Sequence, residues 1–134
     1  MENTKKFAPG TKVIIVEDDK LLGSLLSQRL IDEGCAIRLL EDGEQVQVSA
    51  ETDKPDLILL DLLLPNISGF DILAILKTSS LTKDIPVIIL SCLSNGADIK
   101  RGLDLGADGF LSKSSITIDG IMAEAHKILQ ARNK

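Results

Sequence analysis

The chain has 134 residues, of which 44% are hydrophobic and 26% are charged, a composition that suits one globular domain with a buried core. Its formal charge of −5 argues against direct nucleic-acid binding, because phosphate contacts need clustered Lys and Arg. No apolar run reaches the roughly 20 residues that span a bilayer, and the first residues lack the apolar segment of a signal peptide. We therefore expect a cytoplasmic protein without a membrane segment.

The first half of the chain alternates apolar runs with amphipathic stretches. Residues 1–10 are polar and end in Pro9-Gly10, which predicts a flexible N-terminal tail ahead of a single domain over residues 11–134. A strand is expected over 13–16, then an acidic turn over 17–19 and a helix that ends at Gly34. A second strand over 35–40, whose single Arg suits a sheet edge, precedes a short polar helix over 43–51.

The segment 57–64 is apolar except for Asp61. Such a run predicts a strand that is buried on both faces inside a parallel sheet. Burying an unpaired carboxylate there would cost several kcal/mol, so we expect Asp61 at the open end of the strand, beside groups that stabilise its charge. A loop through Pro65 and Gly69 then leads into a helix over 70–76.

Two further strand–helix units complete the chain. Strands are expected over 87–90 and 109–113, and helices over 96–105 and from Ile118 onward, where apolar residues form one stripe. This alternation predicts an α/β fold with a five-stranded parallel sheet covered by helices on both faces. Because a dinucleotide fingerprint is missing, we favour the flavodoxin-like, doubly wound strand order 2-1-3-4-5.

Three isolated residues invite simple interpretations. Cys35 and Cys92 fall in different predicted strands without metal-ligand spacing, so we expect buried free thiols and no disulfide. The single histidine, His126, falls on the last helix, far from the other polar positions of interest, and is expected at the surface.

Polar residues follow four of the predicted strands: Asp18, Asp61, Ser91 and Lys113. The carboxyl ends of parallel strands share one edge of the sheet, so these side chains should converge there. Clustered carboxylates repel one another unless a cation neutralises them, and their hard oxygen ligands suit Mg²⁺. A carboxylate held beside Mg²⁺, an ammonium and a hydroxyl can itself attack phosphorus and become an aspartyl phosphate. The simpler alternative is a set of unrelated helix-capping and solvated side chains.

Four pieces of the chain, VIIVEDD (13–19), DLILLDLLLPNISGFDIL (56–73), VIILS (87–91) and GADGFLSK (106–113), resemble the receiver domain of bacterial two-component response regulators. The sequence separations of Ser91 and Lys113 from Asp61 agree with that family as well. The resemblance implies that Asp61 is the phosphoacceptor. It also implies that Asp18, Asp61 and the backbone carbonyl of Leu63 ligate Mg²⁺, with Glu17 acting through water.

The resemblance assigns the remaining polar positions to the phosphorylated state. Lys113 would pair with the phosphoryl oxygens, and Ser91 would donate a hydrogen bond to one of them. Phe110 matches the aromatic switch position, although core packing is the alternative for this residue. Asp19 matches no required role and is expected to cap the first helix. Bulky Leu63 and Leu93, two residues beyond Asp61 and Ser91, predict slow loss of the phosphoryl group.

The implied function is that of a phosphoacceptor signalling domain and not of an enzyme, with at most slow self-catalysed phosphotransfer and dephosphorylation. The phosphoryl donor would be a histidine kinase or a histidine phosphotransfer protein. Phosphorylation would switch the surface of the fourth helix, fifth strand and fifth helix. That surface would meet a downstream protein or an output domain of a longer regulator, and it is also a candidate surface for a phosphorylation-dependent dimer.

One departure keeps an alternative open. Family members usually have a proline after the lysine, whereas Ser114 follows Lys113 here, which leaves room for a receiver-like interaction module that is not phosphorylated. Two other classes fit less well. A haloacid dehalogenase needs a second Asp at the position of Leu63, and a flavodoxin needs a hydroxyl-rich phosphate loop where this chain has residues 17–19, which are acidic.

Overall fold

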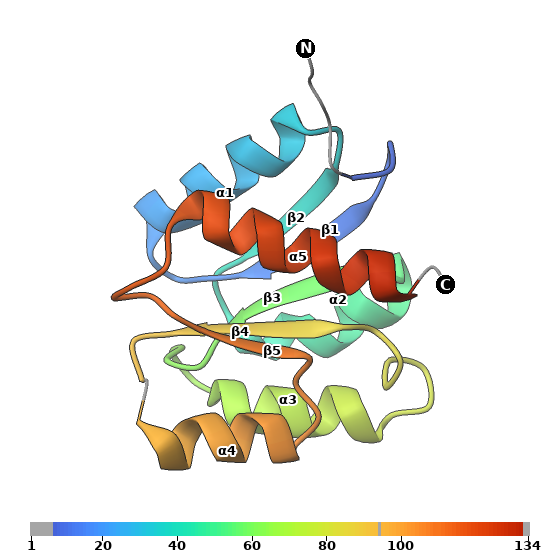
Figure 1. The fold of residues 1–134 in the computed structure, drawn as a ribbon. Coiled ribbons are helices and arrows are strands. Elements are labelled where there is room, and N and C mark those ends of the chain that lie inside the picture. The colour runs from blue at the N-terminus through green and yellow to red at the C-terminus, as the bar shows by residue number, and fades with distance from the viewer. Residues whose placement is uncertain (1–6, 94, 133–134) are drawn as a thin grey trace.

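The computed structural model describes residues 7–93 and 95–132, and its centre is a five-stranded parallel sheet (Figure 1). The strand order is β2-β1-β3-β4-β5, which confirms the predicted flavodoxin-like topology. The strands are β1 (Lys12–Val16), β2 (Ala36–Leu40), β3 (Leu57–Asp61), β4 (Val87–Ser91) and β5 (Gly109–Ser112). The arginine-bearing strand β2 lies at an edge of the sheet, as its sequence predicts.

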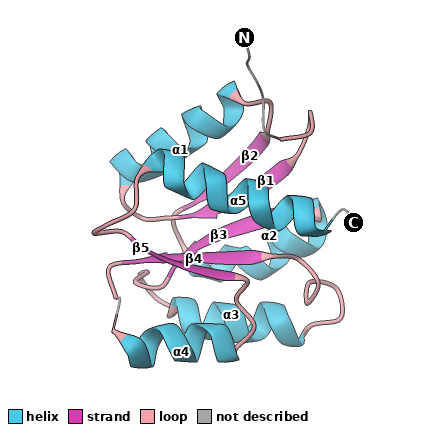
Figure 2. Ribbon diagram, in the orientation of Figure 1, coloured by secondary structure: helices cyan, strands magenta, loops and turns pink. Residues whose placement is uncertain are grey.

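Helices cover both faces of this sheet (Figure 2). Helices α1 and α5 pack on one face, whereas α2, α3 and α4 pack on the other. Their bounds are α1 (Lys20–Asp32), α2 (Val46–Asp53), α3 (Gly69–Thr78), α4 (Gly96–Asp104) and α5 (Ile118–Arg132), with a 3-10 helix η1 (Gly43–Gln45) ahead of α2. Within the described ranges, no helix is long and apolar enough to cross a membrane.

Strand β3 holds the two halves of the core together. All five of its residues are buried, and they alternate between the two faces of the sheet. Ile58 and Leu60 join the cluster beneath α2 and α3, whereas Leu57 and Leu59 join the cluster beneath α1 and α5. Burying one side chain of this size stabilises the folded state by about 1.5–3 kcal/mol. The strand is therefore a rigid base for Asp61, its last residue.

The ends of α1 follow from local hydrogen bonding. Oδ1 of Asp19 accepts hydrogen bonds from the backbone N–H groups of Leu21 and Leu22, at 3.0 and 3.2 Å, which confirms Asp19 as the helix cap. At the other end, Gly34 has a φ of +96°, a conformation that glycine adopts without a steric penalty. The helix therefore ends where the sequence predicts it to end.

The N-terminal segment differs from the expected tail. Phe7 is only 4% exposed, and its ring lies edge-on to the imidazole of His126, with 5.9 Å between the ring centroids. The backbone N–H of Gly10 donates a 3.0 Å hydrogen bond to the carbonyl of Gly34. Residues 7–10 are thus anchored to the domain, and residues 1–6 of the expected tail lie outside the described residues. His126 is half-buried, and Phe7 packs against its ring at the surface of the domain.

The two cysteines have different environments. Cys35 is buried and free, as expected, although β2 begins one residue after it. Cys92 is also free but is exposed, so its predicted position in a buried strand was wrong. The physical reason is that β4 ends at Ser91, where the chain leaves the sheet for the loop that leads to α4.

Candidate functional site

Three carboxylates meet where β1 and β3 end. Glu17, Asp18 and Asp61 each place a carboxylate oxygen within 4.8 Å of the others, a grouping that could hold a metal ion. Glu17 and Asp61 are only 2% and 3% exposed, whereas Asp18 is exposed at the mouth of the pocket. The parallel register that pairs Val16 with Leu60 brings the two strand ends together, so the convergence follows from the topology.

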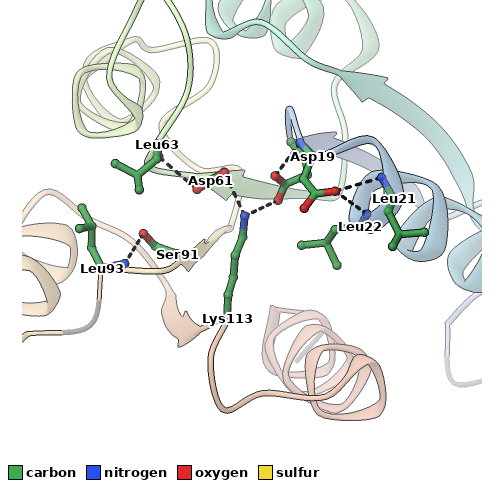
Figure 3. A network of polar contacts seen from close by, with 9 residues as sticks. Asp19, Leu21, Leu22, Asp61, Leu63, Ser91, Leu93 and Lys113 are labelled. Atoms are coloured by element: carbon green, nitrogen blue, oxygen red, sulfur yellow. Dashed lines mark hydrogen bonds and ion pairs between the residues drawn. The ribbon is translucent and has the colours of Figure 1, made fainter.

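Lys113 is the cation of this pocket (Figure 3). It follows β5, and its Nζ atom lies 3.0 Å from Oδ2 of Asp61 and 2.8 Å from Oε1 of Glu17. Burial alone would lower the pKa of Lys113, but the two carboxylates outweigh burial and raise the pKa above its ordinary value. Lys113 therefore carries its positive charge throughout the physiological pH range.

Glu17 is a buried carboxylate whose charge the nearby groups only partly stabilise. Its Oε2 atom accepts a 3.1 Å hydrogen bond from the backbone N–H of Asp19. Its Oε1 atom is buried and lies 2.8 Å from Nζ of Lys113, with which it forms an ion pair. Burial raises the pKa of Glu17, an effect that the nearby lysine only partly offsets. A buried carboxylate next to two further carboxylates, with a single lysine among them, fits the oxygen-ligand chemistry of Mg²⁺.

The backbone around Asp61 fixes the direction of its side chain. Oδ1 accepts a 3.1 Å hydrogen bond from the N–H of Leu63, while Oδ2 faces Lys113. Gly69, the first residue of α3, packs directly against this strand end. A Cβ atom on Gly69 would lie 2.5 Å from the carbonyl oxygen of Asp61 and from Cα of Leu62, which is closer than real atoms approach. A side chain at residue 69 would therefore displace either the helix or the carboxylate.

Ser91 and Phe110 lie on the two neighbouring strands. Ser91 is completely buried, and its hydroxyl accepts a 3.0 Å hydrogen bond from the N–H of Leu93 (Figure 3). Phe110 is partly buried on the α4 side of the sheet, where a Cβ atom on Gly102 would lie 3.1 Å from its ring. Helix α4 thus lies directly on Phe110, and the ring packs against the core in this structure.

The segment after Lys113 forms a tight turn without proline. The carbonyl of Ser112 accepts hydrogen bonds from the N–H groups of Ser115 and Ile116, at 3.2 and 3.0 Å. The hydroxyls of Ser112 and Ser114 are 2.9 Å apart. These contacts hold the turn in a conformation that directs Lys113 toward the carboxylates, so Ser114 is compatible with the pocket.

Comparison with models of protein families identifies the family of this chain. The model of the response regulator receiver domain matches residues 13–126. The chain belongs to the receiver domain family. The fold resembles that of the receiver domain of Francisella response regulator 1452, with a TM-score of 0.82, 29% identity, and coverage of 93% of this chain and 100% of that one. A receiver domain is part of a response regulator and is not a classical enzyme.

The chain is also similar to a longer regulator and to a second receiver domain structure. The chain is 32% identical over 123 residues to the DNA-binding dual master transcriptional regulator RpaA of Synechocystis, covering 92% of this chain and 51% of that protein. It also resembles a structure described as the BeF3-activated DrrB receiver domain, with a TM-score of 0.77, 25% identity, and coverage of 90% of this chain and 98% of that one. The chain therefore spans about half the length of RpaA.

The structure brings together Glu17, Asp18, Asp61 and Lys113, as the sequence predicts. Ser91 ends β4, Leu63 follows the end of β3 and Phe110 lies within β5. Their predicted roles concern a phosphorylated state. The sequence reasoning missed the contact of Gly69 with the Asp61 backbone, although the glycine between the predicted loop and helix was a usable signal. It also missed the hydrogen bond that the Asp19 N–H donates to Glu17.

Proposed function

We propose that Asp61 of this receiver domain accepts a phosphoryl group from a phosphohistidine of a histidine kinase or a histidine phosphotransfer protein. The observation that carries this proposal is the contact of Lys113 Nζ with both Asp61 and Glu17 inside a three-carboxylate pocket. Such a pocket places a nucleophilic carboxylate beside a fixed positive charge, as phosphoryl transfer requires. The description of the DrrB receiver domain as BeF3-activated supports the same chemistry.

The transfer step follows from the placement of the Asp61 oxygens. One carboxylate oxygen of Asp61 forms a bond to phosphorus while the phosphorus–nitrogen bond of the donor breaks. The electron pair of that bond returns to the imidazole nitrogen of the donor. Lys113 faces Oδ2 and would pair with the negative phosphoryl oxygens. A bound Mg²⁺, held by Asp18, Asp61, the carbonyl of Leu63 and, through water, Glu17, would neutralise further negative charge.

We propose that Ser91 and Phe110 then change conformation in response to the phosphoryl group. A phosphoryl group adds about −1.5 to −2 charge and three acceptor oxygens. The Ser91 hydroxyl accepts a hydrogen bond from the N–H of Leu93 in this structure. To donate to one of the phosphoryl oxygens, it would change its orientation relative to that N–H. Because α4 packs on Phe110 at Gly102, a change in the ring position would shift the surface formed by α4, β5 and α5. That surface would meet a downstream protein, an attached output domain or a second phosphorylated copy.

The decisive experiment is an intact mass spectrum after incubation with acetyl phosphate and Mg²⁺. We expect one phosphoryl adduct on the wild type, none after EDTA treatment, and none on Asp61→Asn. The control variant Asp71→Asn removes an exposed carboxylate of α3 and should still be labelled. If the wild type stays unlabelled while a known receiver domain is labelled, the proposal fails. The chain would then be a receiver-like interaction module, and Ser114→Pro would test the turn after Lys113.

A further inference from the structure

A second, chemically different surface feature lies between η1, α2 and α3. Here the structure has an apolar cleft of about 70 Å³, several times the space of one water molecule. Ile72 is buried at its base, whereas Ile75 is 45% exposed at its edge. The cleft is lined by Gly43, Glu44, Gln47, Ile67, Ile72 and Ile75. None of these residues belongs to the carboxylate pocket.

The base of the cleft is closely packed because residue 43 is glycine, which leaves room for the side chains of Ile67 and Ile72. A Cβ atom there would lie 2.3 Å from Cδ1 of Ile72 and 2.6 Å from Cγ2 of Ile67. The wall contributed by α2 also has a polar group without a partner, because Oε1 of Gln47 is buried and receives no hydrogen bond from the described residues. The amide nitrogen of Gln47 is already used, since it donates to Glu51 at 2.9 Å.

The rim of the cleft is acidic. Glu44 is the one charged residue among those that line the cleft. Of the other acidic residues in the segment 41–53, Glu41 pairs with Lys20 and Asp53 pairs with Arg38. Within the described part of the chain, Glu44 and Glu51 form no ion pair, and neither does Asp71, which lies one helical turn before Ile75 on α3. Val48 is 67% exposed and lies one turn after Glu44. The apolar lining of the cleft is thus next to Glu44, a carboxylate without a cationic partner among the described residues.

We propose that this cleft docks a positively charged amphipathic helix of a partner protein. A Leu- or Ile-sized side chain of that helix would insert between Ile67, Ile72 and Ile75, and its Lys or Arg residues would face the acidic rim. A helix is the occupant because the cleft lies along two neighbouring helices, whose groove accepts the ridge of a third. A second copy of this chain is disfavoured because it carries a charge of −5.

A synthetic amphipathic peptide tests this inference directly. The probe is a helix of about 18 residues, with Leu on one face and Lys on the other, titrated into the ¹⁵N-labelled chain. We expect amide shift changes centred on residues 43–51 and 67–78. Ile75→Ser should weaken binding about tenfold, in line with the loss of one buried aliphatic side chain. The double variant Glu44→Gln, Glu51→Gln should weaken binding and reduce its salt dependence.

Matched controls separate this docking from unspecific attraction. Leu81→Ser removes another exposed apolar side chain, outside the cleft, and Glu124→Gln removes a carboxylate of α5; both should bind the peptide as the wild type does. The inference is overturned if Ile75→Ser binds equally well, or if a Glu-for-Lys peptide binds as tightly. It is also overturned if the shifts centre on Leu21 and Leu25 of α1. Binding should persist in Asp61→Asn without Mg²⁺, so it does not depend on phosphoacceptor chemistry.

Discussion

The Nζ atom of Lys113 lies 3.0 Å from Oδ2 of Asp61 and also contacts Glu17, so one ammonium group serves two buried carboxylates. Asp18 adds a third carboxylate at the mouth of the same pocket. The lysine therefore balances only one of three negative charges, and the remaining two equal the charge of one divalent cation. This balance is the electrostatic reason to expect that Mg²⁺ stabilises the folded domain.

Magnesium should raise the melting temperature of the wild type. A ligand that binds only the folded state at 100 times its Kd adds about 2.7 kcal/mol of stability. Asp18→Asn should lose most of this effect, because it removes one carboxylate of the grouping. The measurement is thermal unfolding in MgCl2 compared with EDTA, with Asp71→Asn as a control that should respond fully. An equal response of Asp18→Asn would contradict the proposed magnesium site.

Glu17→Gln should stabilise the metal-free domain at neutral pH. Burial raises the pKa of Glu17 above 4.5, so the folded state binds its proton more tightly than the unfolded state does. Above the raised pKa the carboxylate is ionised in both states, and the cost of burying its charge is fully present. As the pH falls through the raised pKa toward 4.5, that cost disappears. Urea unfolding in EDTA should therefore show a higher free energy of unfolding for Glu17→Gln than for the wild type at pH 7, and this difference should vanish in acid. A difference that does not depend on pH would show that it does not come from the buried charge of Glu17.

Leu63→Asn should shorten the lifetime of the phosphorylated domain. The Leu63 side chain is 52% exposed beside Asp61, and an apolar side chain there offers no hydrogen bond to an attacking water molecule. We expect the wild type to keep its phosphoryl group for many minutes or longer, and the amide side chain to accelerate hydrolysis. A time course of the phosphoryl adduct by intact mass measures both rates. Equal rates would show that Leu63 only covers the rim of the pocket.

Gly69→Ala should cost more stability than Gly102→Ala. At Gly69 the new methyl group meets backbone atoms of Asp61 and Leu62 at 2.5 Å, which cannot move without shifting β3, and we expect a loss of about 1–3 kcal/mol. At Gly102 it meets only side-chain atoms, Cδ1 of Ile89 at 2.8 Å and the Phe110 ring at 3.1 Å, which can shift at a lower cost than the backbone of β3. Alanine also favours the helix by about 1 kcal/mol there. Denaturant unfolding of both variants tests this order, and a reversed order would contradict the close packing at Asp61.

The two thiols should react at very different rates with a thiol reagent such as DTNB. Burial, followed by the nearby charges of Glu33 and Asp56, raises the pKa of Cys35 to about 11, so it holds almost no thiolate at pH 8. Cys92 is exposed on the loop after β4. We expect one fast thiol in the native wild type and none in Cys92→Ser, with Cys35 reacting only after denaturation. Two fast thiols in the native protein would show that the Cys35 side of the core opens readily.

The sequence predicts the sheet, its strand order and the four polar strand ends, because hydrophobic periodicity and parallel topology together determine where Asp18, Asp61, Ser91 and Lys113 fall. Side-chain environments were less predictable. Whether Cys92 is buried depends on the residue at which β4 ends, and strand ends are set by tertiary contacts. Phe7 and His126 illustrate the same limit, because nothing in their local sequence indicates that a residue near the N-terminus packs on the last helix.

The division of the β3 side chains between the two faces of the sheet has a consequence for folding. Ile58 and Leu60 complete one half of the core, and Leu57 and Leu59 complete the other, so neither half has a finished interior without this strand. Fragments cut before or after β3 should therefore remain unfolded when expressed separately. Heat or denaturant should melt the domain in one cooperative transition, and the amides of β3 should be among the last to exchange with deuterium.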